Sequence, residues 1–466
     1  MSKQLKPAST VNVFTILHVV GILLCGCSNL PRLQVQSHND RATPRPSAIR
    51  QDRTVTPQLQ ATTVQAATAT PLPLPTGDPN IRSLVRERQT DLFDQIWTAV
   101  KDSYIDPDLN GLNWEVERQQ MLARIKPGIS DEAFYGAVAN LIDRLGDQHS
   151  YFLSPQDAQK QTQQAAGRYN YAGIGIIVSA NVERGYLYLE QVLPGGPAQA
   201  AGLMPHDQIL EIDGEPAIMD GKRSDGRIVG EVGTQVRLKI RTPGQEPREV
   251  TITRAVVNAK EEVQARLLSG SVGKRIAYVL IPNLYERDIH HRVQKAISDL
   301  MKPGNLDGLV IDMRVNGGGS YLTVKEILAL FTKGIVGGFA DHSGIDEFDT
   351  FQVDENKSGN SQTVPLVVLV GPQTESFGEV FAGILQDQKR ATLIGLPSAG
   401  NIELLYPHDF NGGAELWLAV KRFVLPDGSS WERRGLTPDV NIDKRWDEHA
   451  TDDDPVIAAA LEMLGK

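Results

Sequence analysis

One serine, Ser376, lies between an apolar run and an apolar helical segment, a position that can support nucleophilic chemistry. The run 366–370 predicts a buried strand, and residues 380–385 predict the helix. The first N–H groups of a helix have no intrahelical partner, so they could hold the oxyanion that forms when a serine attacks a carbonyl. By position alone, a serine or threonine that caps the helix is the more common explanation. Ser376 is therefore a candidate nucleophile, and the residues around it must decide between catalysis and simple helix capping.

The region that contains Ser376 has the pattern of an α/β layer architecture. Apolar runs at 276–281 and 308–311 alternate with helical patterns at 289–301 and 324–331. These runs are apolar almost throughout, as expected for strands that are covered on both faces. Residues 258–466 are therefore predicted to form an α/β core.

A small helical domain is predicted over residues 81–168. Apolar residues spaced three and four apart form one helix face: Phe93, Trp97, Val100 and Tyr104. Ser130 predicts the start of a later helix and Gly146 predicts its end. This domain includes the segment 146–150, which contains His149.

Residues 169–257 alternate short β-type runs with turns, and two stretches resemble a PDZ domain of the bacterial protease type. They are Gly173-Ile174-Gly175-Ile176 and the longer stretch 194–214, which begins Pro-Gly-Gly-Pro-Ala and ends Ile-Asp-Gly. The first stretch alone would also suit a plain strand start, so the second carries the resemblance. It implies that the glycine-rich loop of Gly173, Ile174, Gly175 and Ile176 binds an extended peptide, with backbone amides receiving the C-terminal carboxylate.

Four motifs in residues 258–466 resemble those of the carboxyl-terminal processing (tail-specific) serine peptidases and their relatives, tricorn protease and the interphotoreceptor retinoid-binding modules. The motifs are Asp312-Met313-Arg314-Val315-Asn316-Gly317-Gly318-Gly319, Thr374-Glu375-Ser376-Phe377-Gly378-Glu379, Ala382-Gly383-Ile384-Leu385-Gln386-Asp387 with Arg390-Ala391, and Gly435-Leu436-Thr437-Pro438-Asp439. With the helical region and the PDZ domain in the expected order, the resemblance covers about 81–466. It implies a crotonase-like α/β core, endopeptidase activity near substrate C-termini, and Ser376 as nucleophile.

The general base of this family is replaced in the present chain. The processing peptidases use a Ser–Lys dyad, and the lysine position holds Asn401, whose amide cannot accept a proton at neutral pH. The tricorn branch uses a Ser-His-Ser-Glu tetrad, which carries over to His149 and Glu432, with Gln148 in place of the first serine. Histidine titrates near neutral pH, so His149 is the expected base, and Glu432 is expected to orient it or to position a hydroxyl or water.

Each of these residues also has an explanation that involves no catalysis. Processing peptidases often carry an unused histidine in this segment, and the residues around Glu432 would also suit a solvated loop with ion pairs. The resemblance places the oxyanion at the N–H groups of Gly318 and Phe377. The glycine run that contains Gly318 could equally form only a tight turn.

The N-terminus has the features of an export signal. Lys3 and Lys6 precede a short apolar run, which ends in a sequence that resembles a bacterial lipobox with Cys27 as the lipidated residue. An ordinary secretory signal with an incidental cysteine is the alternative. The expectation is a signal peptide over 1–26, a disordered Thr/Ala/Pro-rich tether over 27–80, and an extracytoplasmic protein that is lipid-anchored to a bacterial membrane.

Composition limits the remaining functional classes. Lys plus Arg is 47 and Asp plus Glu is 57, so the net charge of −10 gives no basic surplus for nucleic acid. No zinc-ligand spacing is present, and neither a metal nor an organic cofactor is implied. The sequence leaves a homo-oligomeric state open.

The leading hypothesis is a serine endopeptidase in which the PDZ domain captures extended or unfolded C-termini and Ser376 attacks the peptide bond. The main alternative is a catalytically inactive scaffold that binds peptides or lipids, suggested by Asn401 and the altered serine loop. A third hypothesis is a regulator that presents substrates to a partner protease through its PDZ domain.

Overall fold

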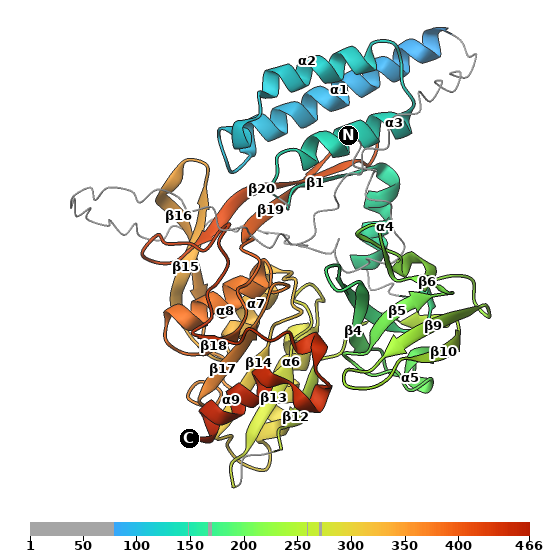
Figure 1. Ribbon diagram of the computed structural model, residues 1–466. Helices are drawn as coiled ribbons and strands as arrows, with labels where there is room; N and C mark the ends of the chain where they lie inside the picture. The colour runs from blue at the N-terminus through green and yellow to red at the C-terminus, as the bar shows by residue number, and fades with distance from the viewer. Residues whose placement is uncertain (1–78, 148, 166–169, 259, 270–272) are drawn as a thin grey trace, which may run out of the picture.

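The computed structural model describes residues 79–147, 149–165, 170–258, 260–269 and 273–466 (Figure 1). The predicted signal peptide and Cys27 lie outside these residues. None of the helices found in the described ranges has the length and apolar character needed to cross a membrane.

Three helices form one end of the molecule, at the top of Figure 1: α1 (Pro79–Ser103), α2 (Trp114–Ile125) and α3 (Asp131–Asp143), with a 3-10 turn η1 (Leu109–Gly111). The predicted start of α3 is confirmed, because the Ser130 hydroxyl accepts a hydrogen bond from the N–H of Ala133. The helices bury residues such as Phe93 together with Leu416 and Leu418 from far along the chain. The N-terminal helices therefore share their core with C-terminal strands.

A five-stranded antiparallel sheet lies beneath these helices. Its order is β1 (Tyr151–Leu153), β20 (Glu415–Val424), β15 (Gly334–Asp341) and β16 (Gly344–Val353), and β19 (Glu403–Asp409) also pairs with β20. Tyr151 of β1 lies opposite Trp417 of β20, and the Ser150 hydroxyl accepts a hydrogen bond from the N–H of Ala419 at 2.9 Å. The segment that carries His149 is thereby fixed to the C-terminal half of the chain.

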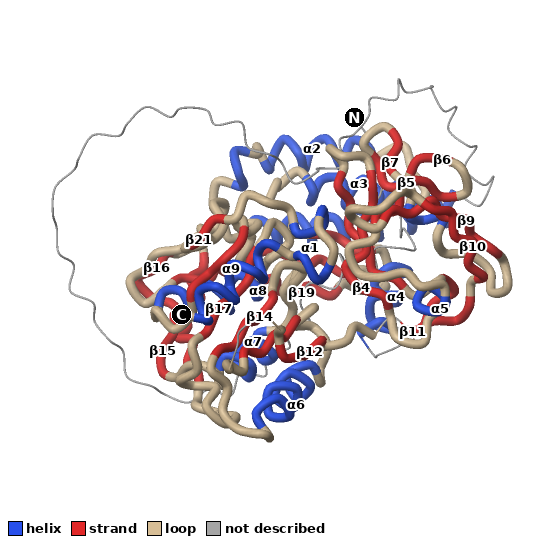
Figure 2. The backbone as a smooth tube through the Cα atoms, turned by 60° about the horizontal axis from the view of Figure 1, so that its bottom comes forward, coloured by secondary structure: helices blue, strands red, loops and turns tan. Residues whose placement is uncertain are grey.

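Helix α4 (Pro155–Ala165) leads to a PDZ domain, which forms a lobe of its own beside the core in Figure 2. Its elements are β2 (Asn170–Gly173), β3 (Ile176–Asn181), β4 (Tyr186–Val192), α5 (Pro197–Ala200), β5 (Gln208–Ile212), β6 (Glu215–Pro216), β7 (Ile218–Met219), β8 (Lys222–Arg223), η2 (Asp225–Arg227), β9 (Gln235–Arg241), β10 (Arg248–Thr253) and β11 (Ala255–Asn258). The main sheet has the order β10-β9-β5-β4-β3 with β6 on β5, while β2 pairs with β11 and β7 with β8. Strand β3 is therefore an edge strand of the PDZ sheet.

The α/β core is built on a six-stranded sheet. In spatial order its strands are β12 (Gln264–Leu267), β13 (Ile276–Leu280), β14 (Gly308–Asp312), β17 (Leu366–Val370), β18 (Thr392–Gly395) and β21 (Val440–Asn441). All neighbouring pairs are parallel except β12 with β13. The remaining elements are α6 (Ile289–Met301), α7 (Tyr321–Leu328), α8 (Phe377–Asp387), α9 (Pro455–Gly465) and the 3-10 turns η3 (Trp446–Glu448) and η4 (Thr451–Asp453).

Helices cover both faces of the core sheet. Val279 of β13 packs on the side of α6, α7 and α8, whereas its neighbour Tyr278 packs on the side of α9. Alternate residues of each strand are therefore buried on opposite faces, which explains the uninterrupted apolar runs in the sequence. The ends of β14 and β17 meet at the same edge of the sheet, where the chain turns into the loops that carry Asn316 and Ser376.

Candidate active site

Ser376 adopts a strained backbone conformation at the junction of β17 and α8. Its φ of 52° and ψ of −128° lie in a region that side chains other than glycine rarely adopt. Its hydroxyl makes no capping hydrogen bond to α8, which removes the simple explanation of a helix-capping serine. A strained serine on a sharp strand-to-helix turn is the arrangement that exposes a nucleophile to a carbonyl.

Backbone contacts hold Ser376 in this conformation. Its N–H donates to the carbonyl of Asn401 at 2.8 Å, and its own carbonyl accepts from the N–H groups of Glu379 and Val380. The residue is 1% exposed. Asn401, at the position expected for the family's lysine, therefore supports Ser376 through its main chain, while no described residue donates to its side-chain oxygen.

The glycine loop after β14 lies directly against Ser376. A methyl group on Gly318 would come within 2.6 Å of Ser376 Cβ and 2.9 Å of the Phe377 nitrogen, and Gly318 has φ of +88°. Both predicted oxyanion donors therefore border Ser376. The N–H of Gly318, however, donates to Oδ1 of Asn316 at 2.9 Å in this state.

His149 contacts a carboxylate that the sequence did not single out. Its Nδ1 lies 3.0 Å from Oε2 of Glu403, and both side chains are almost fully buried. Asp147 fixes the loop, because its Oδ1 accepts the N–H groups of His149 and Ser150, each at 2.9 Å. A proton on Nδ1 that is donated to Glu403 leaves Nε2 as the basic nitrogen of the ring.

Burial sets the protonation state of His149. It lowers the pKa of the imidazole below its ordinary value of 6.5, although the carboxyl groups of Asp147, Glu375, Glu432 and Glu379 oppose this shift. Glu375, the residue before Ser376, is thus close enough for its charge to act on the ring. His149 is neutral at pH 7 and able to accept a proton.

Glu432 lies behind Glu403. Its Oε2 accepts the N–H of Ile402 at 2.9 Å, and its side chain is hydrogen-bonded to that of Glu403. Burial and the repulsion from Glu403 raise the pKa of Glu432, and burial also raises the pKa of Glu403. Glu432 therefore holds a proton that it donates to Glu403, and the direct partner of His149 is Glu403.

A second buried carboxyl group organises the loop after β18. Oε1 of Glu379 accepts from the Ser398 hydroxyl at 2.6 Å and from the Gly400 N–H at 2.8 Å, and Oε2 accepts from the Asn401 N–H at 2.8 Å. These bonds place the Asn401 carbonyl beneath Ser376. Glu379 is thus a support for the serine loop.

The predicted peptide-binding stretch of the PDZ domain connects β2 to the edge strand β3. Gly175 has φ of +83° and lies against Gly196 and Val257, where no side chain would fit without displacement. Ile174 is fully buried, and Ile176 is 8% exposed. Gly173 lies under the ring of Tyr171.

The PDZ domain contacts the serine loop through Gln373. The Gln373 amide accepts from the Tyr188 hydroxyl at 2.9 Å and donates to Glu190 at 2.8 Å and to the Ser179 hydroxyl. Ser179 belongs to the edge strand β3, and Gln373 precedes Ser376 by three residues.

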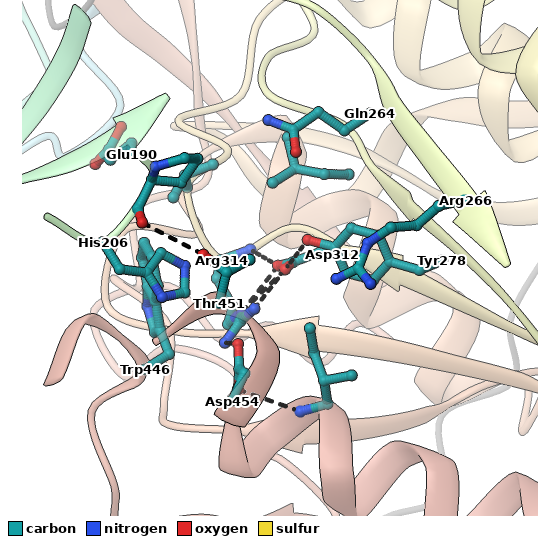
Figure 3. Close-up of a pocket in the computed structure, with 14 residues that line it drawn as sticks. Glu190, His206, Gln264, Arg266, Tyr278, Asp312, Arg314, Trp446, Thr451 and Asp454 are labelled. Atoms are coloured by element: carbon teal, nitrogen blue, oxygen red, sulfur yellow. Dashed lines mark hydrogen bonds and ion pairs between the residues drawn. The ribbon is translucent and has the colours of Figure 1, made fainter. Parts of the chain in front are cut away.

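A buried ion-pair cluster lies at the second contact between the PDZ domain and the core (Figure 3). Arg314 pairs with Asp312 at 2.6 Å and with Asp454 at 2.8 Å, and its guanidinium lies over the ring of Trp446. His206 of the PDZ domain packs on the same ring. The Asp-Met-Arg part of the first motif therefore joins β14, α9 and the PDZ domain.

The fold and this site define a PDZ-containing serine-type peptidase. The model for peptidase family S41 matches residues 275–442, and a PDZ-domain model matches residues 188–242. The chain is 29% identical over 377 residues to the carboxyl-terminal-processing protease of Synechocystis sp., covering 79% of this chain and 85% of the relative. It is 30% identical over 373 residues to the chloroplastic carboxyl-terminal-processing peptidase 2 of Arabidopsis thaliana, covering 77% and 70%.

A solved structure agrees with these sequence matches. The photosystem II D1 C-terminal processing protease superposes with a TM-score of 0.57 at 26% identity, covering 81% of this chain and 97% of that structure. The chain therefore belongs to the carboxyl-terminal processing peptidases, a family of serine-type hydrolases within family S41.

Proposed function

We propose that the chain is a C-terminal processing endopeptidase that has exchanged the family's Ser–Lys dyad for a Ser376–His149–Glu403 system. The observation that carries the proposal is the buried contact of 3.0 Å between His149 and Glu403. Ser376 is held in a strained conformation and donates its N–H to the carbonyl of Asn401, two residues before Glu403. Asn401 supplies no amine, so a base is needed from another residue. Neutral His149 meets that need.

In the proposed reaction, the Ser376 hydroxyl attacks the peptide carbonyl while Nε2 of His149 takes its proton. Glu403 stabilises the imidazolium that forms, and the proton on Glu432 keeps a second charge away from this buried pair. His149 then protonates the leaving amine, and water resolves the acyl-enzyme with His149 again as base. The Phe377 N–H and the Gly318 N–H hold the oxyanion, the latter after leaving Asn316.

The PDZ domain is proposed to capture the substrate's C-terminus. An extended peptide adds to the edge strand β3, and the amides of the stretch from Gly173 to Ile176 receive its carboxylate. Lipidation at Cys27 is proposed to hold the protein at the outer side of a bacterial membrane. Metabolic labelling with a fatty acid that is lost in Cys27→Ser tests the anchor.

Fluorophosphonate labelling of the full chain tests the catalytic proposal. Labelling should be lost in Ser376→Ala, fall strongly in His149→Ala, and persist in Asn401→Ala, because Asn401 bonds to Ser376 through its main-chain carbonyl, which alanine keeps. Equal labelling of the parent and His149→Ala would overturn the assignment of the base.

The catalytically inactive scaffold is the second candidate function. It is supported by the near-complete burial of Ser376 and by the Asn316 side chain that occupies the Gly318 amide. A folded parent that binds peptides through its PDZ domain, yet neither cleaves them nor takes the fluorophosphonate label, would favour the scaffold.

A further inference from the structure

The turn between α1 and α2 contacts the loop between α3 and β1 that carries His149, called the histidine loop below. Nδ2 of Asn110 donates a hydrogen bond to the carbonyl of Leu145 at 2.7 Å. Leu145 is fully buried and lies four residues before His149. Asn110 has a left-handed backbone conformation, with φ of 53° and ψ of 35°. Its side chain therefore anchors the start of the histidine loop to the helical region.

The same side chain contacts Arg433, which follows Glu432 in the chain. Oδ1 of Asn110 accepts from a guanidinium nitrogen of Arg433 at 2.8 Å, and this nitrogen also donates to Oδ2 of Asp106 at 2.6 Å. A guanidinium nitrogen of Arg422, in β20, lies 3.3 Å from the other carboxylate oxygen of Asp106. One turn of the helical region therefore binds two arginines from the C-terminal part of the chain.

The main chain of Arg433 continues this contact toward Ser376. Its N–H donates to the carbonyl of Gly400 at 2.7 Å. The next residue, Asn401, accepts the N–H of Ser376 through its own carbonyl at 2.8 Å. Arg433 has a φ of +62°, a conformation that is strained for a residue other than glycine and that these hydrogen bonds help to hold. Asn110 is thus linked by hydrogen bonds to the histidine loop on one side and to the serine on the other.

We propose that Asn110 and Arg433 are positioning residues that set the separation between the histidine loop and the serine, so that the helical region takes part in catalysis. The inference rests on the proposed Ser376–His149–Glu403 system. The Arg433 side chain is 56% exposed, and contacts at such a position contribute little to the stability of a fold. A displacement of a reacting group by about 1 Å, in contrast, can lower a rate about 100-fold. Loss of the contact should therefore slow the reaction much more than it destabilises the protein.

Fluorophosphonate labelling of the full chain, followed over time, tests this inference. The rate constant of labelling reports the activation of Ser376, whereas the final stoichiometry reports the fraction of chains with a folded site. Asn110→Ala and Arg433→Ala should each lower the rate constant by about 10–100-fold and leave the stoichiometry unchanged. The double variant should match the slower single variant within about twofold, because the two side chains hold one contact. Arg433→Lys keeps a charged donor and should regain part of the rate.

Two further variants are matched controls. Arg434→Ala removes the neighbouring exposed guanidinium, which donates to the Ser430 carbonyl within its own loop. Arg118→Ala breaks an ion pair of 2.8 Å with Asp94, which joins α2 to α1. Both controls should be labelled at the parental rate, because neither contact reaches the histidine loop or the serine.

The remaining outcomes separate the inference from the proposal beneath it. Parental rates in Asn110→Ala and Arg433→Ala, with labelling that still requires Ser376 and His149, would overturn the inference alone. A fall in stoichiometry that matches the fall in rate, or an equal fall in a control, would assign the two residues a role in folding and would also overturn it. A parent that takes no label would overturn the proposed reaction and this inference together.

Discussion

Nδ1 of His149 lies 3.0 Å from Oε2 of Glu403, although 254 residues separate them in the chain. The first comes from the loop between α3 and β1, and the second begins β19. A buried imidazole against a buried carboxylate leaves the other ring nitrogen available to accept a proton, as the proposed base requires. Five expectations about catalysis and stability follow from this site.

Glu403→Gln should lower kcat by about 10²–10⁴-fold with little change in KM, because the charge that stabilises the imidazolium is lost. Glu432→Gln should retain activity within about tenfold, since a neutral amide can donate to Glu403 as the protonated acid does. Steady-state hydrolysis of a peptide substrate measures both. The control is Glu462→Gln on α9, where the side chain of Glu462 is 74% exposed. A larger loss in Glu432→Gln than in Glu403→Gln would reverse the two roles.

The pH dependence of kcat/KM should show a limb that rises with pH and has its midpoint below 6.5, because burial lowers the pKa of His149 and the base must be neutral. Activity should therefore be lost only as the pH falls through this lowered pKa. Rates measured between about pH 4.5 and 8 give the midpoint. A midpoint well above 7 would contradict His149 as base.

Glu375→Gln should reduce the pH dependence of stability. Burial raises the pKa of Glu375 to about 7 from 4.5. A raised pKa means that the folded state holds the proton more tightly, so the stabilisation is present below 4.5 and is lost as the pH rises through about 7. Urea unfolding at pH 5 and pH 8 should show a smaller decrease for the variant, by up to about 3 kcal/mol. Identical decreases in the two proteins would show that Glu375 is ionised at little cost.

Gly318→Ala should abolish activity, because the added methyl group would collide with Ser376 Cβ and the Phe377 nitrogen. A loss of stability of about 1–3 kcal/mol should accompany it. Gly412→Ala is a close control, since Gly412 also has a positive φ, +97°, but its added methyl group would meet no atom within 4 Å. Activity in Gly318→Ala equal to that of the control would mean that the loop and the nucleophile are not in contact.

Ser376→Gly should be more stable than Ser376→Ala by about 1 kcal/mol, since glycine adopts the φ of 52° without strain and alanine does not. Both variants should be inactive. Chemical denaturation of the two proteins gives the difference directly. A more stable alanine variant would show that the strain at this position is absent in solution.

Local patterns predicted the elements around the site better than they predicted its contacts. Helix α6 has the predicted bounds 289–301, because Ile289, Val293, Ile297 and Met301 form one buried face. Strand β17 likewise has its predicted bounds. Both signals are periodic and lie within one segment, which is why a single sequence contains them.

Glu403 was missed because a lone carboxylate beside apolar residues carries no motif. Its one local signal is its position in the run Ile402–Leu405, where a charged side chain must be buried with a partner. The pairing of β1 with β20 was also not predicted, since it joins residues more than 250 positions apart, and no local pattern encodes such a contact. The occupation of the Gly318 amide by Asn316 depends on side-chain geometry alone.

The pairing of β1 with β20 also determines at what point in its synthesis the chain can assemble the proposed active site. The ribosome synthesises His149 early. Ser376, Glu403 and strand β20, which pairs with β1 beside His149, are synthesised more than 200 residues later. A nascent chain therefore has no assembled site before Glu403 and β20 are made, and neither does a fragment that ends before them. Neighbouring polypeptides therefore meet no complete site while about the first four fifths of the chain are being made.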